Sequence, residues 1–280
     1  MTRPPEPGVR LVIRHGICSD GVAMGTLREA LKERLDLDYR EVDNQTYDWE
    51  ATILRNGVEL AAALIAAPAA DGIALVGHSM GGLVCRVANC ALTDPRFKTV
   101  VTTHAKGFQK DDLDAINRTA LGEGLRVGAV VTLATPNSGA MTHGQMSVLA
   151  HALHLVRPLW ARSEGVADLN TDRLFRILQH CRTPTPCLTI SGSWGNRLIR
   201  GSGSITAHHL LQWTMSMREP HDMIVEDISV DLTQSILPHE FTVPPVHQRL
   251  YVDCIDVKHT NIHETAAVHT LVADFIGSNS

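Results

Sequence analysis

The sequence lacks the long apolar segments that membrane proteins and secreted precursors need. No run of about 18 apolar residues occurs in it, which excludes a transmembrane helix. Residues 1–8 contain three prolines and lead directly into an apolar, strand-like stretch, without the apolar segment and small-residue cleavage site of a secretory signal. These absences predict a cytoplasmic protein.

Concentrated charge is also absent. The sequence has no run of five or more like charges, its formal net charge is −5, and its isoelectric point is near 6.3. Nucleic-acid binding requires clustered lysines and arginines that contact phosphates. The composition therefore excludes nucleic acid as an expected partner.

The six cysteines have neither the short paired spacing of a zinc site nor the regular spacing of a disulfide framework. A chain of 280 residues, 44% of them hydrophobic, can form a large core and does not need disulfides. A metal site on His259 and His263 would lack the glutamate that accompanies such a histidine pair in zinc peptidases. We therefore predict mostly free thiols, no metal and no cofactor.

Short apolar runs alternate with helical patterns, which is typical of βαβ units around a mostly parallel sheet. We expect one α/β domain over residues 1–280. Apolar runs predict strands at 9–13, 39–42, 73–76, 128–133, 187–191 and about 250–255. Apolar residues at helical spacing predict helices at 27–35, 54–65, 83–92 and 268–276.

Two segments interrupt the alternation. Residues 95–126 are polar and mixed, whereas residues 141–183 have helical patterns rich in Leu, Met and Trp. We interpret 141–183 as a helical cap inserted over the edge of the sheet. Its apolar residues exceed what a solvated loop needs, so Leu153, Val156 and Trp160 are candidates for lining an acyl pocket. The equal alternative is that they pack the insertion on the core.

The clearest motif is Gly77-His78-Ser79-Met80-Gly81, which follows a predicted strand and precedes a predicted helix. This is the G-x-S-x-G pattern of a nucleophile elbow, in the strand–turn–helix context that it requires. The turn forces the serine into a strained conformation, and its glycines let the strand and the helix approach closely. The motif predicts Ser79 as a nucleophile.

Three segments resemble bacterial esterases and triacylglycerol lipases of the α/β-hydrolase superfamily. Residues 77–86 are similar to the elbow of these enzymes, residues 14–17 to their His-Gly oxyanion loop, and residues 131–139 to their strand ending in a Thr-Pro turn. Arg14 stands where these enzymes usually have an apolar residue. The resemblance implies an α/β-hydrolase fold, with main-chain N–H groups of Ile17 and Met80 as the oxyanion hole.

A serine nucleophile needs a base, and in this fold the histidine follows the last strand. His259 and His263 both satisfy that position. The resemblance favours His259, because the separation from His259 to the apolar positions of the final helix is similar to that in those esterases. His263 remains the alternative base.

The acid should lie between the serine and the histidine in the chain. Asp222 resembles the aspartate of the family's Asp-Gly-x-Val stretch, although Met223 replaces the glycine. Glu226 and Asp227 are fallback candidates. Asn137 offers no carboxylate after the preceding strand, and Asp253 and Asp256 lie too close to His259 in the sequence.

The predicted function is hydrolysis of carboxylic esters by a triad of Ser79, His259 and Asp222. The expected partner is a small-molecule or lipid ester. A thioesterase or an acyltransferase would use the same elbow and differ only in the acyl donor or acceptor. A peptidase and a non-catalytic protein of the same fold are further alternatives, because the fold alone does not decide the function.

Overall fold

The structure is a computed structural model. The described residues are 9–17, 19–37, 42–43, 45–66, 72–104, 110, 114, 116, 125–137, 163–169, 173–193, 249–255, 257 and 259–279.

Within these residues, six parallel strands form one sheet in the order β2-β1-β3-β4-β5-β6. The strands are β1 (Val9–Arg14), β2 (Val42–Asp43), β3 (Gly72–His78), β4 (Val127–Leu133), β5 (Cys187–Ser193) and β6 (Arg249–Ile255). The five longer strands confirm the strands predicted from apolar runs. Of the predicted strand at 39–42, only Val42 is described, and it begins β2.

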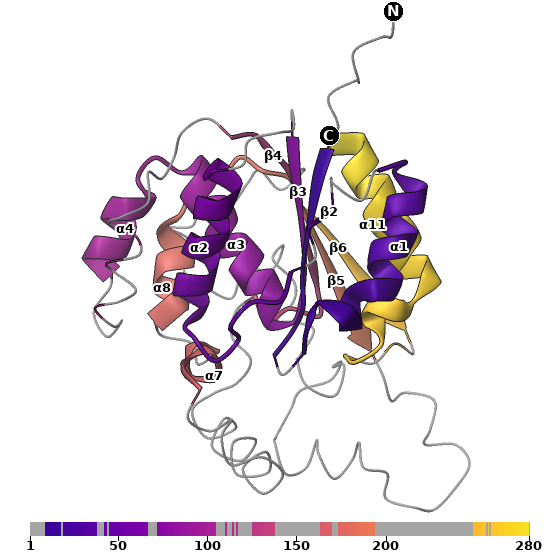
Figure 1. Ribbon diagram of the computed structural model, residues 1–280, viewed down its shortest axis with the longest axis horizontal. Coiled ribbons are helices and arrows are strands. Elements are labelled where there is room, and N and C mark those ends of the chain that lie inside the picture. The colour runs from indigo at the N-terminus through magenta and orange to yellow at the C-terminus, as the bar shows by residue number, and fades with distance from the viewer. Residues whose placement is uncertain are drawn as a thin grey trace, which may run out of the picture.

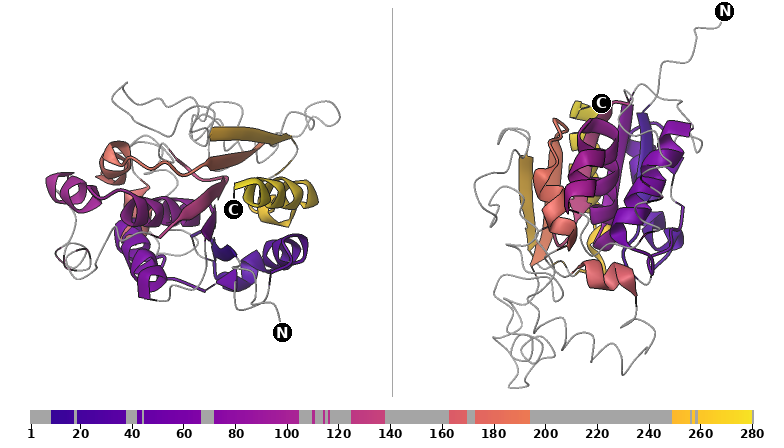
Figure 2. Two further views of the ribbon diagram at one scale, coloured as in Figure 1. Left: turned by 90° about the horizontal axis from the view of Figure 1, so that it is seen from above. Right: turned by 90° about the vertical axis from the view of Figure 1, so that its left-hand side faces the viewer.

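Helices cover both faces of the sheet, which Figures 1 and 2 show as three layers. One face is covered by α1 (Gly25–Arg34) and α11 (Ala266–Asn279), and the other by α2 (Ile53–Ala66), α3 (Met80–Thr93) and α8 (Arg173–His180); α4 (Phe97–His104) packs outside α3 and α8 on this second side. Shorter helices are η1 (Gly21–Met24), α7 (Glu164–Asp168) and η6 (Ile262–Glu264). None of the helices in the described ranges combines the length and the apolar composition needed to cross a bilayer.

Alternate residues of β1 and β3 enter two separate cores. On β1, Leu11 and Ile13 join the core under α1 and α11, while Val12 joins the core under α2 and α3. All three are fully buried, and burial of each such side chain contributes about 1.5–3 kcal/mol. Because both faces are covered, the strands have the continuous apolar sequences by which they were predicted.

Each of the two segments that interrupt the alternation, 95–126 and 141–183, contains a helix that packs on the rest of the fold. The polar and mixed segment 95–126 contains α4, which buries Phe97, Val100 and Val101 on one side. The carboxylate of Asp94 precedes α4 and accepts the main-chain N–H of Arg96 at 2.9 Å. Helix α8, at the end of the predicted cap segment, contacts α3 and α4 and belongs to the helical layer.

Candidate active site

Ser79 stands between β3 and α3 in a strained conformation. Its φ and ψ angles are 53° and −125°, and positive φ in a non-glycine residue costs on the order of 1–3 kcal/mol. Its N–H donates to the carbonyl oxygen of Leu133 at 2.8 Å, which fixes the turn to the end of the neighbouring strand β4. The strand–turn–helix context predicted from the sequence is confirmed.

The motif needs glycines because the backbones of β3, α3 and the end of β1 lie very close together here. A Cβ atom on Gly77 would overlap the main chain of Gly81, and a Cβ atom on Gly81 would overlap the carbonyl groups of Arg14 and His15. Helix α3 therefore begins directly against β3 and against the end of β1. This contact brings the first turn of α3, including the N–H of Met80, next to the loop that follows β1.

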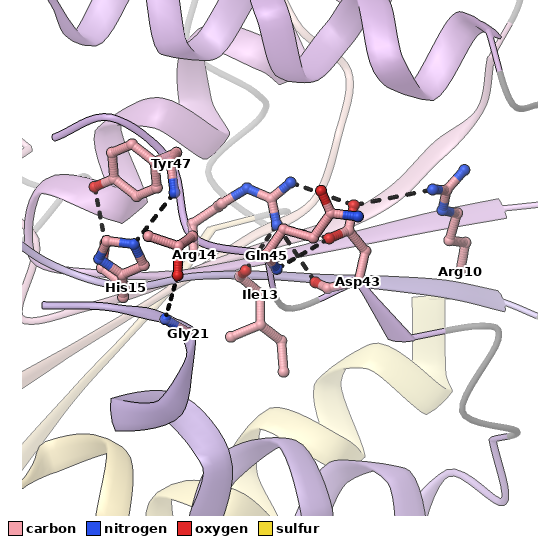
Figure 3. Close-up of polar contacts among 9 residues, drawn as sticks. Arg10, Ile13, Arg14, His15, Gly21, Asp43, Gln45 and Tyr47 are labelled. Atoms are coloured by element: carbon pink, nitrogen blue, oxygen red, sulfur yellow. Dashed lines mark hydrogen bonds and ion pairs between the residues drawn. The ribbon is translucent and has the colours of Figure 1, made fainter. Parts of the chain in front are cut away.

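The loop after β1 is held by a stacked pair, His15 and Tyr47 (Figure 3). Their ring centroids are 4.4 Å apart, and the Tyr47 hydroxyl donates to the main-chain oxygen of His15 at 2.9 Å. The N–H of Tyr47 points to Nε2 of His15 at 3.4 Å, so Nε2 accepts and Nδ1 carries the proton that it donates to the Gly16 oxygen at 2.7 Å. Burial lowers the pKa of His15, which keeps this ring neutral.

Arg14, the residue that departs from the family pattern, is buried and paired with Asp43. Its guanidinium donates to both carboxylate oxygens, at 3.2 and 3.3 Å, and to the carbonyl oxygen of Ile13 at 2.9 Å (Figure 3). The pair joins the ends of β1 and β2. Arg14 thus fills an apolar position because a partner at the end of β2 neutralises its charge.

Gly16 and Ile17 lie against the elbow. A Cβ atom on Gly16 would be 3.0 Å from Cβ of Ser79 and 3.1 Å from Nδ1 of His78. Ile17 follows directly, and its half-buried side chain packs on the core cluster that contains Met80. The structure therefore brings together the loop predicted to supply one oxyanion donor and the helix predicted to supply the other.

Both candidate bases lie beside the elbow strand. His259 and His263 are buried on the turn between β6 and α11, and the centroid of each ring is 4.9 Å from the His78 ring. Nε2 of His78 lies 2.8 Å from the main-chain oxygen of His259. Burial lowers the pKa of His263, and its Nδ1 has no hydrogen-bond partner within the described ranges.

Several candidates lie outside the described residues. These are the acid Asp222, its fallbacks Glu226 and Asp227, and the cap residues Leu153, Val156 and Trp160. Asn137, which offers no carboxylate after β4, lies within the described residues, and its main-chain oxygen accepts a hydrogen bond from the Arg86 guanidinium at 2.9 Å.

The sequence did not indicate the role of α7 beside the elbow. The carboxylate of Asp168, fully buried, accepts the N–H of Ile53 at 2.8 Å and so caps the start of α2. A Cβ atom on Gly165 would overlap the carbonyl oxygen of Trp49 and lie 3.3 Å from Sδ of Met80. Helix α7 therefore packs close to the residue that begins α3. No local pattern could predict a capping residue that lies 115 positions away.

The chain is similar in sequence to one family of proteins and in fold to solved structures. The profile of the family described as "Putative serine esterase (DUF676)" matches residues 8–167. An esterase from Pyrococcus furiosus has a similar fold, with a TM-score of 0.50 at 13% identity over 97% of this chain and 82% of that one. A protein from Listeria innocua gives 0.49 at 13% identity, covering 96% of this chain and 94% of that one. A comparison with curated proteins finds no match to the sequence.

The family match includes β1, the loop after it, the elbow and α7. Together with the parallel sheet and the conformation of Ser79, it indicates a serine hydrolase with an α/β-hydrolase fold. The chain belongs to this serine esterase family.

Proposed function

We propose that the protein hydrolyses carboxylic esters through a covalent acyl-enzyme on Ser79. The observation that carries the proposal is the backbone of Ser79, held at φ 53° between β3 and α3 in a chain of a serine esterase family. This position presents the hydroxyl where the N-terminal end of a helix favours developing negative charge.

In the proposed reaction, the hydroxyl oxygen of Ser79 attacks the ester carbonyl carbon while His259 accepts the hydroxyl proton. The main-chain N–H groups of Ile17 and Met80 donate to the oxyanion of the tetrahedral intermediate. His259 then gives its proton to the departing alkoxide, so an alcohol leaves and the acyl group stays on Ser79. A water molecule, deprotonated by His259, attacks the acyl carbon; the carboxylic acid leaves and Ser79 regains its proton.

The neighbouring histidines support this assignment of charge. Burial lowers the pKa of His15 and of His263, and lowers that of His78 well below its usual range. These three rings are therefore neutral near pH 7. An imidazolium that forms on His259 during the reaction meets no like charge from them. Asp222 is the proposed carboxylate that orients His259 and stabilises the imidazolium.

Apolar side chains near the elbow support a substrate with an apolar acyl group. Ile17, Tyr47 and Trp49 are partly buried and pack on the cluster that contains Met80. We further propose, from the sequence, that Leu153, Val156 and Trp160 line the same acyl site. Each buried methylene contributes about 0.8 kcal/mol, so kcat/KM should rise about fourfold per added carbon until the site is full.

A panel of p-nitrophenyl esters from acetyl to octanoyl, with acyl-CoA thioesters alongside, tests the proposal. We expect ester hydrolysis whose kcat/KM increases with chain length, and loss of at least about 10³-fold activity in Ser79→Ala. Ser191→Ala, at a buried serine of β5, is the matched control and should stay active. A preference for acyl-CoA would identify a thioesterase instead. Full activity in Ser79→Ala would refute the nucleophile.

A polar substitution at Leu153 or Val156 tests the cap. If these residues line the acyl site, the optimum chain length should become shorter while acetyl ester hydrolysis changes less than about threefold. An unchanged profile in both variants would instead indicate that the segment only packs on the core.

A further inference from the structure

His78 occupies the position next to the nucleophile, yet the proposed reaction gives it no chemical role. It is the last residue of β3, it is buried, and its side chain lies between two loops. On one side, its Nδ1 would be 3.1 Å from a Cβ atom on Gly16 in the loop after β1. On the other side, its Nε2 lies 2.8 Å from the main-chain oxygen of His259.

The contact with His259 fixes the proton on the His78 ring. A carbonyl oxygen can only accept, so Nε2 of His78 must carry the hydrogen and donate it. The groups that face this ring are His259 and His263 on the turn after β6 and His15 on the loop after β1. Desolvation together with these neighbours lowers the pKa of His78, so the ring stays neutral and Nδ1 is unprotonated.

We propose that His78 is a positioning residue that holds the backbone of the base, His259, at a fixed place relative to the nucleophile on the adjoining residue, Ser79. This inference rests on the proposed function, because it assigns His259 as the base. The hydrogen bond joins the centre of the sheet to a turn 181 residues away in sequence. It acts on the carbonyl group of His259 and does not involve the His259 ring.

The same turn contains a second bond of the same kind, which provides a matched comparison. Nε2 of His269 in α11 lies 2.9 Å from the main-chain oxygen of His263. His269 is buried to a similar extent, 5% exposed against 8% for His78. The His269 bond, however, joins the turn to its own following helix and does not reach β3. If position relative to Ser79 matters, only the His78 bond should affect catalysis strongly.

Three variants test this difference: His78→Leu, His78→Gln and His269→Leu. We expect His78→Leu to lower kcat about 10–100-fold with KM changed less than threefold, because misplacement of a reacting group by about 1 Å has this effect. Glutamine carries an N–H at a reach similar to Nε2 of histidine, so His78→Gln should recover most of the loss. His269→Leu should lower the melting temperature but change kcat less than about threefold.

Equal kcat losses in His78→Leu and His269→Leu, or no recovery in His78→Gln, would overturn the positioning role. If His78→Leu does not fold, two other measurements still test the positioning role. These are the kcat of His78→Gln relative to that of the wild type, and the tautomer of the His78 ring. In ¹⁵N NMR spectra of the whole protein near pH 7, His78 should be the neutral Nε2–H tautomer. A neutral ring that carries its proton on Nδ1 would contradict the bond.

Failure of the proposed function gives a different result. In that case wild-type protein does not hydrolyse the esters and is not labelled by a fluorophosphonate at Ser79, whatever the His78 tautomer is. Failure of the positioning role alone leaves an active, labelled wild type whose kcat is insensitive to His78→Leu.

Discussion

The two loops that meet at the elbow are held in different ways. The loop after β1 is fixed by side chains at several points: the Arg14–Asp43 pair, the stacked rings of His15 and Tyr47, and the Tyr47 hydroxyl. In the turn after β6, side chains bind main-chain oxygens: those of His259 and His263 accept from histidine rings, and that of Asn261 accepts from the Thr265 hydroxyl. The difference follows from what each loop is proposed to supply.

An oxyanion hole uses main-chain N–H groups, so the backbone of its loop must be rigid. A base must accept and return a proton, so its ring must stay free while its backbone is held. The ion pair and the ring stack beside the loop after β1 suit the first requirement, and hydrogen bonds to the carbonyl groups of the turn after β6 suit the second. Substitutions in each loop should therefore have different signatures.

The largest effect is expected from the turn after β6. His259→Ala should lower kcat by about 10⁴-fold or more, because loss of the base leaves only the oxyanion hole and binding. His263→Ala is the matched control and should lower kcat less than about tenfold. Steady-state kinetics with a p-nitrophenyl ester measure both. The reverse order would transfer the role of base to His263.

The acid is expected to have the next largest effect. Asp222→Asn should lower kcat by about 10³–10⁴-fold, because the amide no longer stabilises the imidazolium or its tautomer. Glu226→Gln and Asp227→Asn are the controls. If Asp222→Asn stays active and one of these two controls loses most of its kcat, the residue changed in that control is the acid.

The loop after β1 is tested by Gly16→Ala. The added Cβ atom would be 3.0 Å from Cβ of Ser79, so either the loop or the elbow must shift. We expect kcat/KM to fall about 10²-fold, in the range for loss of an oxyanion donor. Gly25→Ala is the control, because a Cβ atom there meets nothing within 4 Å. Wild-type rates in Gly16→Ala would contradict the place of this loop in the active site.

Arg14→Met should affect stability more than rate. The substitution removes the close ion-pair partner of Asp43, whose side chain is 11% exposed; Arg10 lies farther away at 3.9 Å, and the N–H of Gln45 still donates to the carboxylate at 3.1 Å. We expect unfolding free energy to fall by about 2–3 kcal/mol in urea titrations, with kcat changed less than tenfold. Arg28→Met breaks an exposed pair with Glu29 and should cost less than about 1 kcal/mol. If Arg14→Met and Arg28→Met lowered the unfolding free energy equally, burial would not strengthen the pair of Arg14 with Asp43.

The last prediction concerns pH. Because the pKa values of His15, His78 and His263 are lowered by folding, the unfolded chain binds more protons below about pH 6.5. Stability should therefore fall as the pH drops from 6.5 to 5.5, by at most about 1.4 kcal/mol per pH unit for each ring. His78→Gln should make this fall shallower in urea titrations. Constant stability over this range would show that the rings are protonated in the folded protein.

The sequence predicted the sheet and the elbow because both depend on local patterns. Strands buried on both faces are continuous apolar runs, and the elbow needs glycines at fixed spacing around Ser79. Helix α4 was missed because its three buried residues lie among threonines and charged residues. Its signal was Asp94 followed by a proline, a typical helix start.

The contacts that hold the site could not be predicted in the same way. Arg14 binds Asp43 over 29 residues, His15 binds Tyr47 over 32, and His78 binds His259 over 181. A pairing between distant positions leaves no periodic pattern in the sequence. The sequence therefore showed that Arg14 is unusual for the family, but only the fold supplies its partner.

Mass spectrometry of the protein treated with a fluorophosphonate tests the central claim most directly. The reagent forms a covalent bond to a serine oxygen only where that serine is activated as a nucleophile. We predict one adduct, on the peptide that contains Ser79, and none in Ser79→Ala, while Ser191→Ala is labelled like the wild type. An adduct on another residue, or an unlabelled protein that still hydrolyses esters, would contradict the account.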